Sequence, residues 1–206
     1  MRSVPALRIL LLALSAGTAA SCSDSSAPPY DTRPPADLSV VHGAASSTPL
    51  FNPTVSFYAK RGEDREARIY FQDEVGGQGE EYVRLLVSAT SLLATPDGLP
   101  IAPGDSVLIT MSVVDPSEML FDMQPTGLKF SPLKPAELKI HYDHANGDLN
   151  DDGTIDSRDT TIEHTLAIWR QENLGDPFVR LTSVLTIATD EADAELTGFS
   201  RYALAY

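Results

Sequence analysis

Twelve residues in the second half of the chain carry the clearest chemical signal in the sequence. Oxygen-bearing side chains occur at positions 1, 3, 5, 9 and 12 of the segment 148–159, which is the spacing of a calcium-binding loop. Gly153 stands at position 6, where the chain has to turn sharply around the ion. The sequence therefore predicts one Ca²⁺ site. Its ligands are the side chains of Asp148, Asn150, Asp152, Asp156 and Asp159 and the carbonyl of Thr154 at position 7.

Two features set this loop apart from the usual helix–loop–helix arrangement. Its last ligand is Asp159, as in the loops of dockerins, where most calcium loops have glutamate. A shorter last ligand makes bidentate binding harder, so we expect an affinity in the weak range of extracellular modules. The residues before the loop, 136–142, read as a strand, and the second loop and flanking helices of a dockerin are missing from the sequence pattern. Ile155, at position 8, is expected to point back into the core.

The alternative interpretation of the segment is an acidic turn that binds nothing. Against it, the four carboxylates at the ligand positions repel one another unless a cation lies between them. Elsewhere, His141 and His144 flank Asp143 and offer nitrogen ligands for zinc. We expect these two histidines to point apart, because His141 lies on the polar face of a strand and His144 begins a loop. Zinc normally needs three convergent protein ligands.

The segments that position these residues alternate apolar and polar side chains with a period of two. In 136–142, Leu138, Ile140 and Tyr142 share one face, which is the pattern of a half-buried strand. Trp169 fits the same alternation and is expected in the core. Many short strands separated by Gly and Pro turns predict an all-β fold, an antiparallel β-sandwich. The other strands are predicted at residues 54–59, 66–72, 81–87, 106–113, 165–171, 178–182, 184–188, 193–197 and 200–206.

The N-terminus has the order of a secretory signal. Basic residues, an apolar run over 9–14 and small residues up to Ser21 predict a signal peptide over 1–21, with a run too short to span a bilayer. The stretch 18–22 resembles a bacterial lipoprotein box, with Ala19 where leucine is usual, so Cys22 is predicted to be lipidated. Residues 22–50, rich in Ser, Pro and Asp, read as a disordered, lipid-anchored tether. These features predict a bacterial cell envelope protein on the outer membrane or periplasmic face, or alternatively a secreted one.

The composition of the chain limits the number of domains and the classes of partner and of cysteine chemistry. The chain has 206 residues, of which 42% are hydrophobic, enough for one folded domain over 51–206 behind the tether. Its 29 acidic against 15 basic residues give a net charge of −14, which argues against nucleic acid as a partner. The single cysteine excludes an intrachain disulfide framework or a thiolate zinc cluster.

A family resemblance covers the chain from Arg84 to Tyr206. The run 86–92 is similar to a strand that enters a small-residue turn in ZU-five domains, and 128–142 resembles their "F-x-x-P-x-x-L-x-x-x-Y" run. The segments 166–169 and 178–181 look like the next two strands, and 198–204 looks like the closing "H-F-S-x-Y" strand. ZU-five domains are β-sandwiches of ankyrins, netrin receptors and bacterial secreted lipoproteins. The resemblance implies an interaction or spacer module.

The closing strand departs from the family pattern at one position. Some ZU-five domains cut their own backbone between the Phe and Ser of this motif, with the preceding histidine as general base. Here Gly198 stands where the histidine would be, while Phe199 and Ser200 are retained. We therefore expect the backbone to stay intact, with Phe199 and Tyr202 as core aromatics.

The function that these observations favour is a binding or structural module. The sequence contains no nucleophile elbow, phosphate-binding loop or HExxH motif, so no catalytic residue is assigned and we expect a protein that is not an enzyme. Its expected contacts are the membrane, through the lipid, and a protein or glycan partner. The alternative is a hydrolase acting on an extracellular or envelope polymer through paired carboxylates. A cleft with two isolated carboxylates would favour the enzyme.

Overall fold

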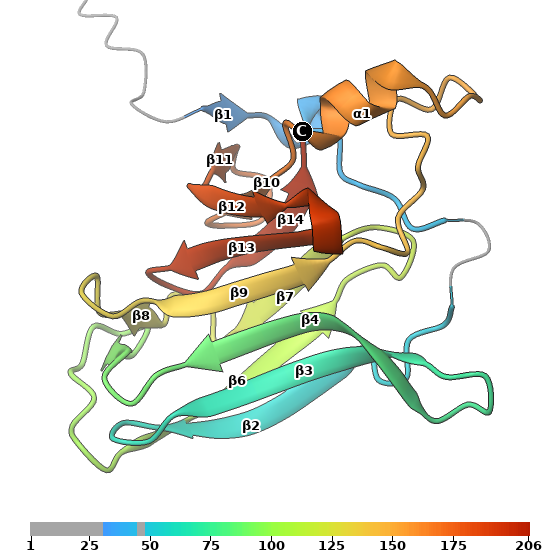
Figure 1. The fold of residues 1–206 in the computed structure, drawn as a ribbon. Coiled ribbons are helices and arrows are strands. Elements are labelled where there is room, and N and C mark those ends of the chain that lie inside the picture. The colour runs from blue at the N-terminus through green and yellow to red at the C-terminus, as the bar shows by residue number, and fades with distance from the viewer. Residues whose placement is uncertain (1–30, 45–47) are drawn as a thin grey trace, which may run out of the picture.

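The fold is described from a computed structural model, which describes residues 31–44 and 48–206. Antiparallel strands form two facing sheets, with short helices at one end of the molecule (Figure 1). The predicted all-β class and antiparallel sandwich are confirmed. The predicted signal peptide, Cys22 and the first part of the predicted tether lie outside the described residues.

The larger sheet has seven strands and contains both the first and the last strand of the described chain. Every neighbouring pair in it is antiparallel. In spatial order its strands are β1 (Thr32–Arg33), β11 (Phe178–Arg180), β10 (Ala167–Gln171), β14 (Arg201–Ala205), β7 (Leu120–Gln124), β6 (Ser106–Val113) and β2 (Thr54–Lys60).

The second sheet has five strands and lies in front of the first in Figure 1. Its order is β12 (Ser183–Thr186), β13 (Glu191–Leu196), β9 (Ala136–His141), β4 (Gln78–Val87) and β3 (Arg65–Gln72). A separate pair closes one end, formed by β5 (Leu92–Ala94) and β8 (Lys129–Phe130). The helical pieces are α1 (Ser157–Glu163) and the 3₁₀ turns η1 (Pro35–Asp37) and η2 (Ile187–Thr189).

Alternation along the strands places one apolar face of each sheet in a common core. On β9, Leu138 and Ile140 are fully buried, whereas Lys139 between them points outward. Aromatic rings bridge the two sheets, with Tyr82 of β4 at 5.5 Å from Phe121 of β7, centroid to centroid. Burial of these side chains removes apolar surface from water and supplies the main stabilisation of the fold.

The prediction that residues 22–50 form a tether is wrong for residues 31–44, which pack on the domain. Leu38 and Val41 are buried, and Val41 exchanges backbone hydrogen bonds with Leu204 and Met119 at 2.9 Å. This segment covers the outer face of the larger sheet, where Trp169 is 1% exposed, so Trp169 is a core residue as expected. Residues around Leu38 therefore pack as part of the described domain and give that face an apolar cover.

Several elements were not predicted from the sequence, among them the strand β7 and the helix α1. The strand β7 was missed, although Phe121 and Met123 alternate with a polar residue in it. The helix α1 has only seven residues and no helical apolar period, and an N-terminal capping box stabilises it instead. The sequence pattern shows no helix on either side of the acidic loop. The helix α1 corrects this expectation for the C-terminal side of the loop.

Candidate metal loop

The acidic loop connects β9 with α1 and lies close to the C-terminus of the chain (Figure 1). Its last three residues, Ser157 to Asp159, already belong to α1. The loop thus runs from a strand into a helix. The strand before the loop was predicted, whereas the helix after it was not. Ile155 is 75% exposed and covers Gly147, which corrects the expectation that it reaches the core.

The first half of the loop is wrapped around the carboxylate of Asp148. The backbone N–H groups of Asp152 and Gly153 donate to its two oxygens at 3.1 and 2.8 Å. This wrapping needs two left-handed residues, Asp151 with φ of 55° and Gly153 with φ of 87°. Positions 4 and 6 of the loop therefore supply the sharp turn that the spacing predicts.

The second half of the loop is closed by Asp159, which is only 3% exposed. One of its oxygens accepts the N–H of Asp156 at 2.7 Å, and the other accepts the N–H groups of Leu149 and Asn150 at 2.9 and 3.3 Å. The Asp156 N–H is the main reason that the pKa of Asp159 lies below its ordinary value of 3.8. Position 12 thus ties the start of the loop to the start of α1.

The remaining side chains keep their oxygens near the surface. Asp152 accepts the N–H of Thr154 at 3.0 Å, and the hydroxyl of Thr154 is the main cause of the lowered pKa of Asp152. The guanidinium of Arg158 lies 3.0 Å from the other Asp152 oxygen. Within the described ranges, no three of the loop carboxylates approach one another within 4.8 Å. The chain therefore assembles the loop backbone, while the ligand oxygens remain spread.

The donor set fits a calcium ion by its chemistry. All six predicted ligand atoms are oxygens, which is the set that Ca²⁺ takes in proteins. A carboxylate has two oxygens with about four lone-pair sites, so an oxygen that accepts one N–H still has capacity for an ion. An inward movement of exposed side chains, and of Arg158 away from Asp152, is needed to bring the oxygens around one centre.

The end of the chain is tied to this loop. The hydroxyl of Tyr206 donates to the carbonyl of Leu149, and Arg33 of β1 donates to the carbonyl of Tyr206 at 2.9 Å. Leu149 itself packs against the main core. The conformation of the loop is therefore coupled to β14 and to the N-terminal segment, two elements that hold the larger sheet together.

The other residues that the sequence singled out lie apart from the loop. His141 contacts Glu81 and Glu191 on the outer face of the five-stranded sheet, whereas His144 contacts Glu80 and Asp143. The expectation that the two histidines point apart is confirmed. Ser200 is 1% exposed.

The closing strand leaves little space around Gly198. A Cβ at Gly198 would come 2.9 Å from the carbonyl oxygen of Leu128. The Oγ of Ser200 accepts a hydrogen bond from Nε of Arg170 at 2.9 Å. Phe199 and Tyr202 are fully buried, as expected of core aromatics.

A groove of about 1210 Å³ is lined by residues of β9, β12 and β13 in the five-stranded sheet and of β1, β10 and β11 in the larger sheet. Glu137 of β9 and Glu195 of β13 both line it and are register partners across the two strands. Like charges directly opposite each other are unfavourable in a sheet. The sequence did not indicate this pair, because only the register of two strands far apart in the chain brings the two residues together.

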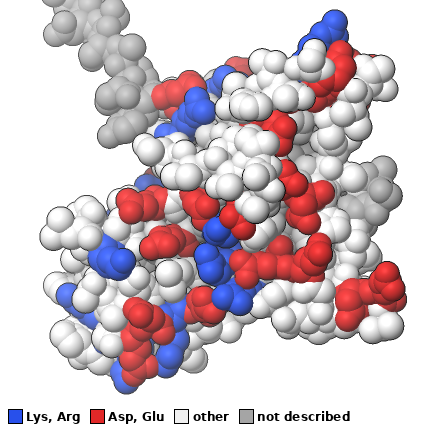
Figure 2. Space-filling model, viewed as in Figure 1, with Lys and Arg blue, Asp and Glu red and all other residues white. Residues whose placement is uncertain are grey.

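The rest of this face carries ion pairs. Figure 2 shows Lys and Arg side chains next to Asp and Glu side chains over the five-stranded sheet. Lys139 lies 2.8 Å from Glu191, and Arg68 lies 3.0 Å from Glu81. The face is therefore a solvated network of opposite charges.

Comparisons with protein-family models, with curated proteins and with solved structures found no match to this chain. Within residues 31–44 and 48–206, no helix has the length and apolar character needed to cross a membrane.

Proposed function

We propose that this chain is a calcium-stabilised β-sandwich module that binds or supports a partner at the bacterial cell envelope. The observation that carries the proposal is the backbone of the acidic loop, which turns around Asp148 and is closed by Asp159. Ca²⁺ bound there would offset two of the four negative charges at the ligand positions and hold α1, β9 and the C-terminal Tyr206 in one arrangement. Its role in the proposal is structural.

The location of the module rests on the N-terminus. The signal-like order of residues 1–21 and the lipoprotein-box resemblance around Cys22 support a lipid anchor. The order of motifs from Arg84 to Tyr206 supports a ZU-five-like interaction or spacer role. A membrane contact through the lipid and a protein or glycan partner are the contacts that this proposal implies.

Thermal unfolding with calcium, with magnesium and with a chelator tests the proposal. An ion that binds only the folded state adds about 2.7 kcal/mol at one hundred times its Kd, and weak extracellular-type affinity reduces this to about 1 kcal/mol at millimolar calcium. For a domain of this size, that gain raises the Tm by about 2–4 °C. Magnesium should act more weakly, because it demands a stricter octahedral geometry.

A matched pair of variants assigns the effect to the loop. Asp148→Asn and Asp151→Asn each remove one negative charge, but only Asp148 is at a ligand position. Asparagine also tolerates the left-handed backbone of Asp151. Calcium should stabilise the Asp151→Asn variant as it stabilises the wild type and should have little effect on Asp148→Asn. Equal melting of the wild type in calcium and in chelator would sink the proposal.

A second candidate function is a hydrolase of an extracellular or envelope polymer, favoured by Glu137 and Glu195 in the groove. Two carboxylates on either side of a scissile bond are the usual means of glycoside hydrolysis. Release of reducing ends from envelope polysaccharides by the wild type, lost in Glu137→Gln and in Glu195→Gln, would support the enzyme. Activity that persists in both variants would remove this pair from consideration.

A further inference from the structure

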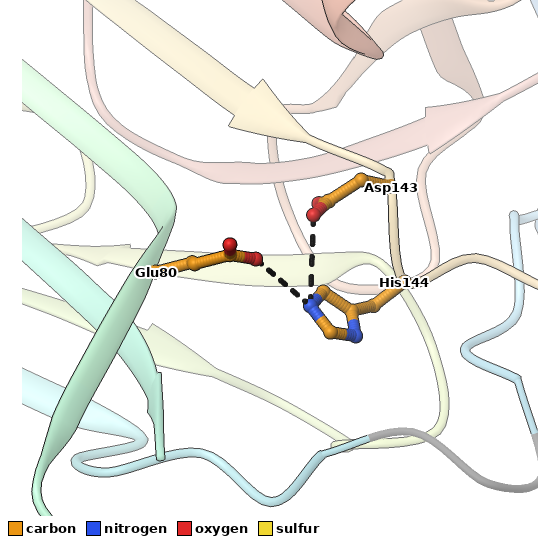
Figure 3. A group of neighbouring side chains, drawn as sticks. All are labelled: Glu80, Asp143 and His144. Carbon is orange, nitrogen blue, oxygen red and sulfur yellow. Dashed lines mark hydrogen bonds and ion pairs between the residues drawn. The ribbon is translucent and has the colours of Figure 1, made fainter. Parts of the chain in front are cut away.

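A second group of metal-ligating side chains includes two residues that precede the acidic loop. Asp143 and His144 follow β9, and Glu80 comes from the start of β4, 64 positions earlier than His144. Figure 3 shows the three side chains pointing toward one another across the gap between these two segments. One ligand atom from each residue lies within 4.8 Å of the others.

The distances within the group fit a metal site better than a hydrogen-bonded one. Nε2 of His144 lies 3.4 Å from Oε2 of Glu80 and 3.5 Å from Oδ2 of Asp143. An N–H···O hydrogen bond has its optimum near about 2.9 Å, so both contacts are long. A tetrahedral zinc ion with ligands at roughly 2.0–2.2 Å puts neighbouring ligand atoms about 3.4 Å apart.

The histidine is held in place by its surroundings. Its ring centroid lies 4.1 Å from that of Phe71, which is buried in the core. The N–H of Ala44 donates to the carbonyl of His144 at 3.0 Å, and the N–H of Ala145 donates to Tyr142 at 2.8 Å. A ligand fixed in this way loses little conformational freedom when an ion binds.

The charge of the group favours a cation. Two carboxylates meet one imidazole, and a neutral imidazole leaves a charge of about −2 to be balanced. A divalent ion at this point would offset the repulsion.

The other histidine provides an internal contrast. His141 also has two carboxylate neighbours, but it presents a different nitrogen to each: Nε2 to Glu81 at 3.4 Å and Nδ1 to Glu191 at 3.7 Å. One ion cannot bind both nitrogens of one ring. His144 presents the same nitrogen to both of its carboxylates, which is what a shared ion requires.

We propose that Glu80, Asp143 and His144 form a binding site for a divalent transition-metal ion of the zinc type. The imidazole nitrogen selects such an ion over Ca²⁺ and Mg²⁺, which prefer oxygen ligands. Three protein ligands leave a fourth position for water or for a donor atom of a partner. Glu80 is 77% exposed at its side chain, so this position faces the solvent. The site shares no residue with the acidic loop, which begins at Asp148.

Titration of zinc chloride into the full chain at neutral pH, with calcium present, tests this site. We expect one zinc ion per chain, and Co²⁺ in its place should give the visible absorption of a tetrahedral complex. His144→Gln should weaken zinc binding by about 100-fold or more, because changes in outer-shell residues alone cost about 10–100-fold. His141→Gln, the matched control, should bind zinc with an affinity within about threefold of wild type.

Three results would overturn the site: no zinc binding by the wild type, unchanged binding by His144→Gln, or an equal loss in His141→Gln. Melting curves of both variants in chelator separate ligand loss from misfolding. If His144→Gln proves unfolded, Glu80→Gln replaces it, because Glu80 is exposed and its change removes a ligand without disturbing the core.

Discussion

Replacing Gly198 with alanine should destabilise the domain through a single close contact. The new Cβ would lie 2.9 Å from the carbonyl oxygen of Leu128 and 3.5 Å from Nη2 of Arg170. The backbone on each side is fixed, because Phe199 donates to the carbonyl of Leu128 at 2.9 Å and accepts from Gly127 at 2.9 Å. Neither strand can move away without breaking hydrogen bonds in a fully buried region.

The expected cost is that of overpacking a buried site, about 1–3 kcal/mol. At about 2–4 °C per kcal/mol for a domain of this size, Gly198→Ala should lower the Tm by about 2–12 °C. Circular dichroism melting measures it directly. Gly147→Ala is the matched control, since its new Cβ would lie 3.1 Å from a methyl group of Ile155, an exposed side chain that can move.

An unchanged Tm for Gly198→Ala would refute the reasoning, because it would show that the backbone around Leu128 can move to make room for the new Cβ.

The same geometry bears on self-cleavage. Ser200 accepts from Arg170, whose guanidinium is always protonated and cannot act as a base. Intact mass should therefore show one uncut chain for the wild type. A released peptide beginning at Ser200 would contradict this.

The remaining predictions concern charge and location. The hydrogen bond between Lys139 and Glu191 lowers the pKa of Glu191 from its ordinary value of 4.5 and raises the pKa of Lys139 from its ordinary value of 10.5. The ion pair therefore stabilises the fold between these two pH values. Glu191→Gln should cost about 0.5–1 kcal/mol in urea unfolding at neutral pH, and the difference should shrink as the pH falls below 4.5. Cys22→Ala should move the protein out of the membrane fraction in which wild type is recovered, and unchanged fractionation would refute lipidation.

The strands could be predicted because their signal is local. The strand β6 was predicted with the bounds that it has, Ser106–Val113, since its apolar residues Val107, Ile109, Met111 and Val113 recur at every second position. The N-terminal segment was misjudged for a physical reason. Leu38 and Val40 stand in a short run of mixed polar and apolar residues, and the sequence does not reveal that Trp169 lies on an outer face that they cover.

The candidate sites divide in the same way. The acidic loop was found from spacing alone, because all its ligands fall within twelve residues. The pairing of Glu137 with Glu195, and of Glu80 with His144, depends on how distant strands are aligned. No periodicity or motif encodes that alignment, so the sequence predicted neither group.

The most direct test of the central claim is a calcium titration followed residue by residue by NMR. The amides of Leu149, Asn150 and Gly153 donate to the carboxylates of Asp159 and Asp148, so they report any change in the loop. We predict that their signals shift most and saturate at millimolar calcium, and that Asp148→Asn suppresses the shifts. Loop signals that stay in place while calcium is added would contradict a calcium-stabilised module.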